Sequence, residues 1–147
     1  MLFNPAASLF NTIRLALAGR LHFPRGRVGD QWLDPDGRRF TVFREVTVDP
    51  GKGQPHKPGA RFQVRFHVAN MTARQNERFS VIPIPFIVGL RGFRSKLWMI
   101  DRATGDFQGV YLWDSIQAAE RYAGSFAMRF MTGRALPRSV WYRITAI

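Results

Sequence analysis

Cysteine is absent from the 147 residues of this chain. This absence excludes disulfide bonds, thiolate catalysis, iron–sulfur clusters and zinc sites built from cysteine. It fits a protein of a reducing compartment, and we expect a cytoplasmic location. The sequence also offers few other metal ligands, because the three histidines are scattered and no carboxylate cluster accompanies them. We therefore predict neither a metal site nor a bound cofactor.

Long hydrophobic runs are also missing. No stretch reaches the ~18 apolar residues that a membrane-spanning helix needs. The apolar segment 6–18 has no basic region before it and no convincing cleavage site, so it is a poor signal peptide. Motifs for phosphate loops, dinucleotide binding, zinc proteases and esterases are absent as well, which removes most support for those activities.

The composition is that of a folded domain with a basic surface. Apolar residues make up 46% of the chain and aromatic residues 14%, which excludes disorder as a description of the whole. The net charge is +12, with 22 basic and 10 acidic residues. The basic residues never form a long block, so nucleic acid is not the expected main partner.

The first 59 residues are predicted to form an N-terminal extension. A helix is expected over residues 6–18, and four of its apolar side chains share one stripe: Leu9, Phe10, Ile13 and Leu17. We expect this stripe to pack on the domain or on a partner subunit. The alternative is peripheral attachment to a membrane, with help from Arg14 and Arg20.

A β-hairpin follows this helix, with strands 31–33 and 39–48 around a turn that contains Pro35 and Gly37. Residues 49–59 hold three prolines and three glycines and are predicted to be a loop or linker. We place the boundary of the main domain, residues 60–147, after this segment.

From residue 60 the pattern becomes regular. A strand ends near residue 68, and Thr72 with Gln75 resembles a capping box that opens a helix. Pro83 and Pro85 must kink or unwind that helix. Strands 93–100 and 107–113 form an antiparallel hairpin.

A second helix is expected after this hairpin, with Asp114 and Gln117 as its capping pair and Gly133 at its end. Residues 139–147 form a closing strand. The order β-α-β-β-α-β predicts an α+β domain of ferredoxin-like topology, with two helices on one face of the sheet. We expect the other face to carry Trp, Tyr and Phe side chains and to be covered by the sheet of a second copy, which gives a homodimer.

Three segments resemble a known superfamily. They are Leu90-Arg91-Gly92-Phe93-Arg94-Ser95-Lys96-Leu97-Trp98, Thr104-Gly105-Asp106-Phe107-Gln108-Gly109-Val110-Tyr111-Leu112-Trp113-Asp114-Ser115 and Ala118-Ala119-Glu120-Arg121-Tyr122. The chain is similar, roughly over residues 60–147, to the dimeric α+β barrel superfamily and within it to the YdhR-like mono-oxygenase branch. The resemblance implies a homodimer with sheets face to face and a small apolar pocket between each sheet and its helices. Its activities include cofactor-free oxygenases, isomerases and haem enzymes, and no invariant catalytic motif can be transferred.

Aromatic and basic side chains are the candidates for chemistry. His67 is a candidate general base, haem ligand or proton donor, or else a structural histidine at the dimer interface. A pocket for an apolar or aromatic ligand would be lined by Phe66, Trp98, Tyr111, Trp113, Tyr122 and Phe126, although large aromatic residues on a sheet more often belong to core or interface packing. Arg94 and Lys96, with Arg65, alternate on neighbouring strands. They would hold an anionic substrate or form interface ion pairs with Glu45, Asp106 or Asp114.

Two functions of different classes follow. The first is a small-molecule-binding dimeric barrel that acts as a cofactor-free mono-oxygenase on an apolar or aromatic substrate. The alternative is a non-enzymatic module whose basic surface and N-terminal helix contact an acidic partner, a membrane surface or a nucleic acid. A third hypothesis, haem binding, depends on His67 alone.

Overall fold

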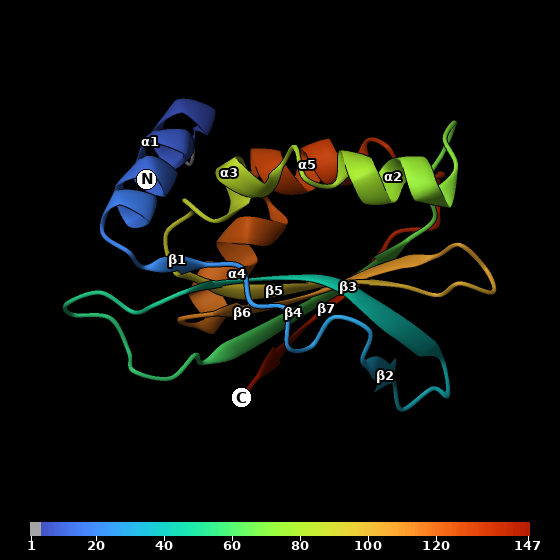
Figure 1. Cartoon of the computed structure of the whole chain (residues 1–147), viewed down its shortest axis with the longest axis horizontal. Coiled ribbons are helices and arrows are strands. Elements are labelled where there is room, and N and C mark those ends of the chain that lie inside the picture. Colours follow the sequence, from blue (N-terminus) through green and yellow to red (C-terminus); the bar gives the residue numbers. More distant parts are fainter. Residues whose placement is uncertain (1–3) are drawn as a thin grey trace.

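The computed structural model describes residues 4–147; the first three residues of the predicted extension lie outside this range. These residues form one seven-stranded sheet and five helices (Figure 1). The helices are α1 (Pro5–Leu17), α2 (Ala73–Phe79), α3 (Ile84–Ile87), α4 (Ile116–Ala123) and α5 (Phe126–Thr132). The strands are β1 (Leu21–His22), β2 (Gln31–Leu33), β3 (Arg39–Val48), β4 (Ala60–Phe66), β5 (Phe93–Ile100), β6 (Phe107–Trp113) and β7 (Trp141–Ala146).

The strand order confirms the ferredoxin-like topology. The strands lie in the order β1-β3-β5-β6-β4-β7, all pairs are antiparallel, and β2 pairs only with β3. The four strands β5-β6-β4-β7 are those of the β-α-β-β-α-β unit. Strand β3 extends the same sheet, because it pairs with β5 from Thr41–Ile100 to Thr47–Ser95. The predicted extension therefore supplies strands to the main sheet, and a domain boundary at residue 59 stays a prediction.

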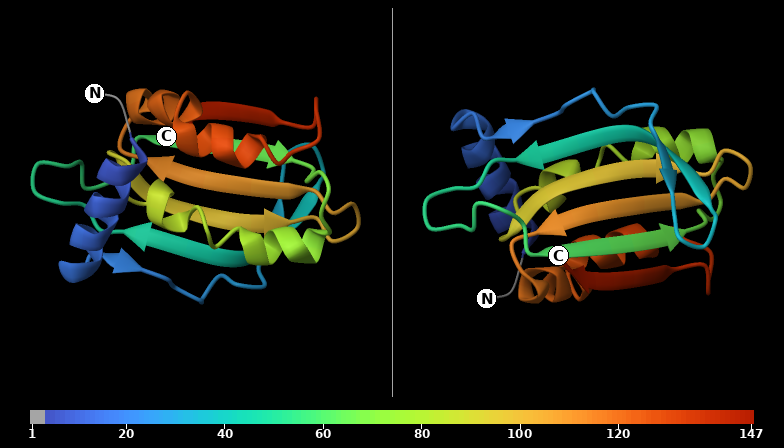
Figure 2. Two further views of the ribbon diagram at one scale, coloured as in Figure 1. Left: turned by 90° about the horizontal axis from the view of Figure 1, so that it is seen from above. Right: turned by 90° about the horizontal axis from the view of Figure 1, so that it is seen from below.

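The helices lie over one face of the sheet, and the hairpin of β2 and β3 crosses one end of the other face (Figure 2). The expectation that Trp, Tyr and Phe side chains occupy the face away from the helices is only partly right: Trp32 and Phe40 pack there, whereas three other aromatic residues of the sheet do not. Trp98, Tyr111 and Trp113 lie in the core that the helices cover, where the Trp113 ring is 5.0 Å from that of Tyr122 on α4. A shift of one residue in strand phase exchanges the two faces, and periodicity alone does not fix that phase.

The opposite face carries a smaller apolar cluster. It consists of Phe40, Val42, Leu97, Met99 and Val110, with Trp32 packed against it. The Trp32 side chain comes from β2, so the hairpin covers part of this face of the sheet with residues of the same chain.

One predicted helix start follows the expected capping chemistry and one does not. Thr72 and Gln75 form the full capping box of α2. Asp114 is not the cap of the next helix, because the Ser115 side chain accepts the hydrogen bond from the Ala118 amide. The single helix expected up to Gly133 is two helices, α4 and α5, since Ser125 starts a new helix by accepting from the Met128 amide.

Helix α1 begins at Pro5 after the cap Asn4, but it faces the molecule with its polar side. Its buried residues are Ser8, Thr12 and Leu15. The Ser8 hydroxyl donates to the Phe86 carbonyl and the Thr12 hydroxyl to the Pro85 carbonyl. The expectation that the apolar stripe packs on the domain is therefore wrong, because these hydroxyl groups satisfy carbonyls around α3 that would otherwise be unpaired. None of the helices within residues 4–147 has the length and hydropathy to cross a membrane.

Candidate functional site

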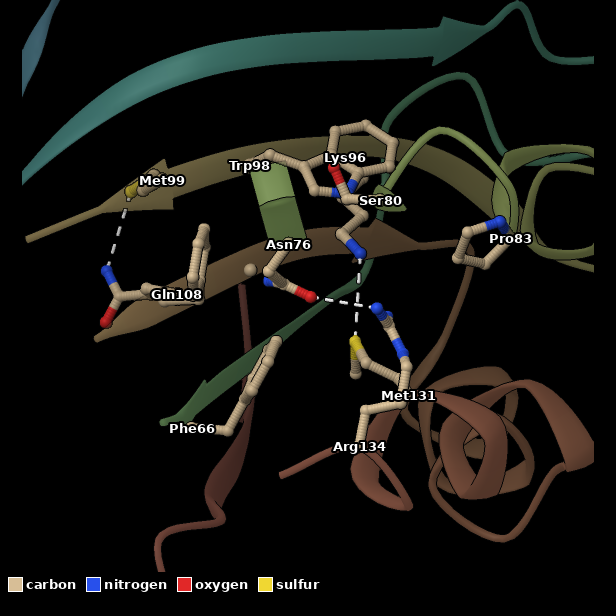
Figure 3. Close-up of a pocket in the computed structure, with 12 residues that line it drawn as sticks. Phe66, Asn76, Ser80, Pro83, Lys96, Trp98, Met99, Gln108, Met131 and Arg134 are labelled. Carbon is tan, nitrogen blue, oxygen red and sulfur yellow. Dashed lines mark hydrogen bonds between the residues drawn. The ribbon is translucent and has the colours of Figure 1, made fainter. Parts of the chain in front are cut away.

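The centre of the candidate site is the amine of Lys96 on β5. Lys96 is 2% exposed and points toward the helices (Figure 3). Its Nζ lies 4.4 Å from the ring centres of both Trp98 and Tyr111, and 4.0 Å from the Sδ of Met131. No ion pair formed within residues 4–147 includes Lys96. The amine is thus enclosed by aromatic rings and a thioether.

These surroundings change the protonation of the amine. Burial lowers the pKa of Lys96 well below its usual value, and the positive charges of Arg134 and Arg44 lower this pKa further. The neutral amine is favoured, and a neutral amine has a lone pair that accepts a proton. A buried lysine of this kind is a candidate general base.

A glycine in the neighbouring strand makes room for this lysine. Gly109 on β6 pairs with Trp98 on one side and Val64 on the other. A Cβ at position 109 would lie 3.2 Å from the Cε of Lys96 and 2.9 Å from the Cε1 of Tyr111. A glycine inside a strand often marks such a close approach.

The amine borders a small cavity between the sheet and helices α2 and α5 (Figure 3). Its volume is about 20 Å³, room for one water molecule. The residues that line it are Phe66, Asn76, Ser80, Pro83, Lys96, Trp98, Met99, Phe107, Gln108, Gly109, Met131 and Arg134. Most of the wall is apolar, with a few polar groups that converge on it, as in small-molecule sites.

Two half-buried arginines give the cavity a positive potential. Arg134 donates a hydrogen bond to the Oδ1 of Asn76 at 2.8 Å, and Arg44 donates to the Oγ of Ser80 at 2.5 Å. Burial lowers the pKa of both guanidinium groups. The Nε of Arg134 is buried and has no hydrogen-bond partner among the described residues. An anionic group in the cavity would be electrostatically favoured.

A second hollow adjoins the cavity. It is an apolar groove of about 230 Å³ on the helical side, lined by Pro5, Ile82, Pro83, Phe86, Phe126, Ala127 and Phe130. Pro83 lines both the groove and the cavity, and it lies in the short segment between α2 and α3. The wall between the two spaces is therefore built from the proline-containing segment.

The aromatic residues predicted for a pocket are only partly brought together. Phe66 and Trp98 line the cavity, and the Tyr111 ring borders the Lys96 amine. Tyr122 lies deeper: its hydroxyl is 2.8 Å from that of Tyr111, and burial raises the pKa of both phenols. Trp113 is fully buried in the core and does not line the cavity.

The remaining predicted residues lie elsewhere. Phe126 lines the apolar groove. Arg94 donates to Asp114 at 3.1 Å and to the Pro55 carbonyl at 2.7 Å, which ties the loop 49–59 to the sheet. Arg65 points to the face of the sheet away from Lys96, where it pairs with Asp34.

His67 does not line the cavity. Its Nδ1 lies 2.8 Å from the Oδ1 of Asp106, whose other oxygen accepts a hydrogen bond from Arg38 at 2.9 Å. The imidazole is thus held at the far end of β4 by an ion-pair network. Within residues 4–147 no group of three or more histidine or carboxylate side chains is arranged to hold a metal ion.

Several lining residues were missed by the sequence analysis. Asn76 and Ser80 are four residues apart on α2, so they share one helical face. The capping box at Thr72 sets the start of that helix, so the sequence could have indicated that these two residues share a face. No sequence pattern pointed to the lining residues Met131 and Arg134 or to the nearby Arg44. Their approach to Lys96 depends on how α5 and β3 pack.

Comparison with known proteins shows the fold. No family model and no curated protein matches this chain. A ferredoxin-fold protein from Listeria monocytogenes, described as related to antibiotic biosynthesis monooxygenases, matches with a TM-score of 0.56 and 12% identity over 78% of this chain and 68% of its own. A monooxygenase-like protein from Listeria innocua matches with a TM-score of 0.54 and 13% identity over 75% and 64%. A heme-degrading enzyme from Listeria monocytogenes matches with a TM-score of 0.53 and 13% identity over 90% of both chains.

These likenesses establish the ferredoxin-like fold. At such low identities they extend to the fold alone, and they do not identify the YdhR-like branch.

Proposed function

We propose that this protein binds a small, planar aromatic molecule between its sheet and helices and oxidises it as a cofactor-free mono-oxygenase. The observation that carries the proposal is the Lys96 amine, which is fully buried beside an aromatic cavity with no carboxylate partner among the described residues. The fold shared with monooxygenase-like proteins supports the same reading.

The chemistry needs a base and dioxygen. The neutral Lys96 amine takes a proton from an activated CH₂ group of the substrate, which leaves a carbanion conjugated with the aromatic rings. The carbanion transfers an electron to O₂, and recombination of the two radicals forms a carbon–oxygen bond. Loss of water then yields a ketone, so that R₂CH₂ + O₂ gives R₂C=O + H₂O. The substrate supplies all four electrons, and no further reductant is required.

The arginines stabilise the charged intermediate. Deprotonation places negative charge on the substrate, and the guanidinium groups of Arg134 and Arg44 lie close enough to Lys96 to lower its pKa. Fixed positive charge in a site with little water stabilises such an anion strongly. The preferred ligand is therefore a phenolic or enolic aromatic compound that becomes anionic in the site.

The substrate needs more room than the cavity provides. Drug-sized ligands occupy pockets of roughly 300–1,000 Å³, whereas this cavity holds about 20 Å³. Displacement of Pro83 would join it to the apolar groove of about 230 Å³. We infer that the segment between α2 and α3 is the entrance through which the ligand reaches Lys96.

A haem-dependent reaction through His67 does not fit this site. The cavity wall contains no histidine, and the Nδ1 of His67 faces Asp106. No step is assigned to haem for these reasons.

The test is oxygen uptake with tricyclic phenols that carry an activated CH₂ group, such as dithranol. We expect one O₂ consumed per ketone formed and one ¹⁸O atom from ¹⁸O₂ in the product. Replacement of the amine by an apolar side chain of similar length, Lys96→Met, should lower kcat by about 10²–10⁴-fold, the usual contribution of a general base.

Lys57→Met is the matched control, because Lys57 is exposed and lies in the loop 49–59. Quenching of tryptophan fluorescence by the substrate reports binding separately from turnover. Oxygen uptake by Lys96→Met equal to that of the wild type would refute the catalytic role. Failure of the whole phenol panel to quench fluorescence would refute the binding site itself.

A further inference from the structure

Helix α1 presents its apolar side to solvent. The buried residues Ser8, Thr12 and Leu15 lie on one side, and the stripe Leu9, Phe10, Ile13 and Leu17 lies on the opposite side. The exposed fractions in this stripe reach 65% for Phe10 and 83% for Leu17. Four neighbouring apolar side chains on one helix face are more than the scattered apolar residues of an ordinary surface.

The inner side of α1 is fixed firmly, so its orientation is not arbitrary. Asn11 donates to the Gly89 carbonyl at 2.8 Å, in addition to the bonds from Ser8 and Thr12. Gly89 lies so close to α1 that a Cβ there would come within 1.9 Å of the Ser8 carbonyl oxygen. Turning the helix to bury its stripe would break all three hydrogen bonds.

Basic side chains surround the same helix. Arg14 is exposed on α1, which has no acidic residue between Pro5 and Leu17. A cleft of about 590 Å³ runs beside α1 and is lined by Arg20, Lys52 and Arg91, with Asp114 as its single carboxylate. Asp114 is already paired with Arg94 at 3.1 Å. The cleft opens on the inner side of α1, where Ser8, Asn11 and Leu15 also line it, so Arg14 is the basic residue that the helix itself presents.

We propose that α1 docks this protein on an anionic phospholipid surface, with its apolar stripe inserted among the acyl chains. An exposed apolar face next to basic residues is the arrangement of interfacial amphipathic helices. Arg14 contacts the phosphate and carboxylate groups of the lipids, and the net charge of +12 attracts the protein to an anionic surface. This proposal is independent of the oxidation at Lys96.

Area and charge favour lipid over a second copy of the chain. Four side chains on one 13-residue helix offer less than the ~800 Å² per partner that a stable protein interface buries. A bilayer instead surrounds each inserted side chain. The net charge of +12 adds attraction to an anionic surface.

The test is cosedimentation of the full chain with phosphatidylcholine vesicles, with and without phosphatidylserine. We expect binding only to the vesicles with phosphatidylserine, and weaker binding as salt is added. The variant Phe10→Ser/Ile13→Ser/Leu17→Ser should bind at least about tenfold more weakly, because it removes most of the inserted apolar area. Arg14→Gln should weaken binding about fivefold, because Arg14 is the exposed basic residue on α1.

The matched control is Leu33→Ser/Leu136→Ser, two exposed apolar residues outside α1. It should bind like the wild type, and circular dichroism should show that both serine variants are folded. Because the chain has no cysteine, a Phe10→Cys variant can carry one environment-sensitive dye, whose emission should shift to the blue on anionic vesicles.

Equal vesicle binding by the α1 variant and its control would overturn the proposal, and so would binding without any dependence on phosphatidylserine. Light scattering gives another decisive outcome. Self-association that the α1 variant abolishes, with no vesicle binding, would show that a second copy covers the stripe instead.

Discussion

The Lys96 amine is buried among aromatic rings and a thioether, and no ion pair within residues 4–147 includes it. Its pKa is lowered well below the usual value, first by burial and then by Arg134 and Arg44. The unfolded chain therefore carries a proton on this amine at pH values where the folded chain does not. Between the lowered pKa and about 10.4 the unfolded state binds more protons, so the free energy of unfolding rises with pH, by at most about 1.4 kcal/mol per pH unit.

The variant Lys96→Met is expected to be more stable than the wild type at neutral pH. It removes the cost of deprotonating and burying the amine, and apolar replacement of buried charged groups gains about 1–4 kcal/mol in other proteins. The gain should shrink as the pH rises toward about 10.4, where the amine is neutral in both states. Urea unfolding at a series of pH values measures both effects, with Lys57→Met as control. A difference in stability that stays constant with pH would contradict the lowered pKa.

At the scale of elements, the hairpin of β2 and β3 is held over the sheet by one buried ion pair. Arg65 on β4 donates to Asp34 in the turn, and its other nitrogens donate to Asp36 at 2.5 Å and Gln108 at 2.7 Å. Gln63 donates to the same Asp34 carboxylate at 2.9 Å. The hairpin is thereby attached to the centre of the sheet face that the helices leave open.

Arg65→Met should destabilise the fold by about 3 kcal/mol, because it leaves the buried Asp34 carboxylate without its cationic partner. The double variant Asp34→Leu/Arg65→Met should recover part of this loss, and thermal unfolding of the set measures the coupling. Additive effects in the double variant would show that the pair is not coupled.

Arg65 also lowers the pKa of Asp36 to about 2. The stabilising contribution of the ionised Asp36 is present above pH ~3.9 and is lost as the pH falls toward 2. Arg65→Met should therefore weaken this loss of stability in acid.

The sequence predicted most helices and strands, but not which side of each one faces the core. Alternation, capping residues and turn residues predicted α2, the β5–β6 hairpin and the closing strand, because these signals are local. The orientation of α1 and the sides of Trp98 and Tyr111 depend instead on which partner the rest of the chain provides. Gly109 was the signal within the site that could have been used, since a glycine inside a strand suggests that a side chain passes over it.

At the scale of the whole molecule, one row of side chains on the open face is only partly covered within the chain, by the hairpin whose Trp32 ring lies 5.9 Å from the Arg61 guanidinium. The row crosses five strands from β3 to β7, and its members are paired in register: Thr47, Ser95, Leu112, Arg61 and Thr145. All five are at least partly exposed, in contrast to Leu97 and Met99 beneath the hairpin. A flat row of this kind can pack against the same row of a second sheet at the usual separation of about 10 Å.

We therefore expect a homodimer whose two sheets meet at this row, while the helices and α1 stay outside the interface. Leu112→Arg places one charge per subunit opposite its own copy, and it should convert the dimer to a monomer with little effect on the fold. Native mass spectrometry of the purified protein measures the state, and Leu136→Arg, an exposed position in the segment between α5 and β7, is the control. A dimer that survives Leu112→Arg would place the contact on another surface, and a wild-type monomer would leave the hairpin as the cover of this face.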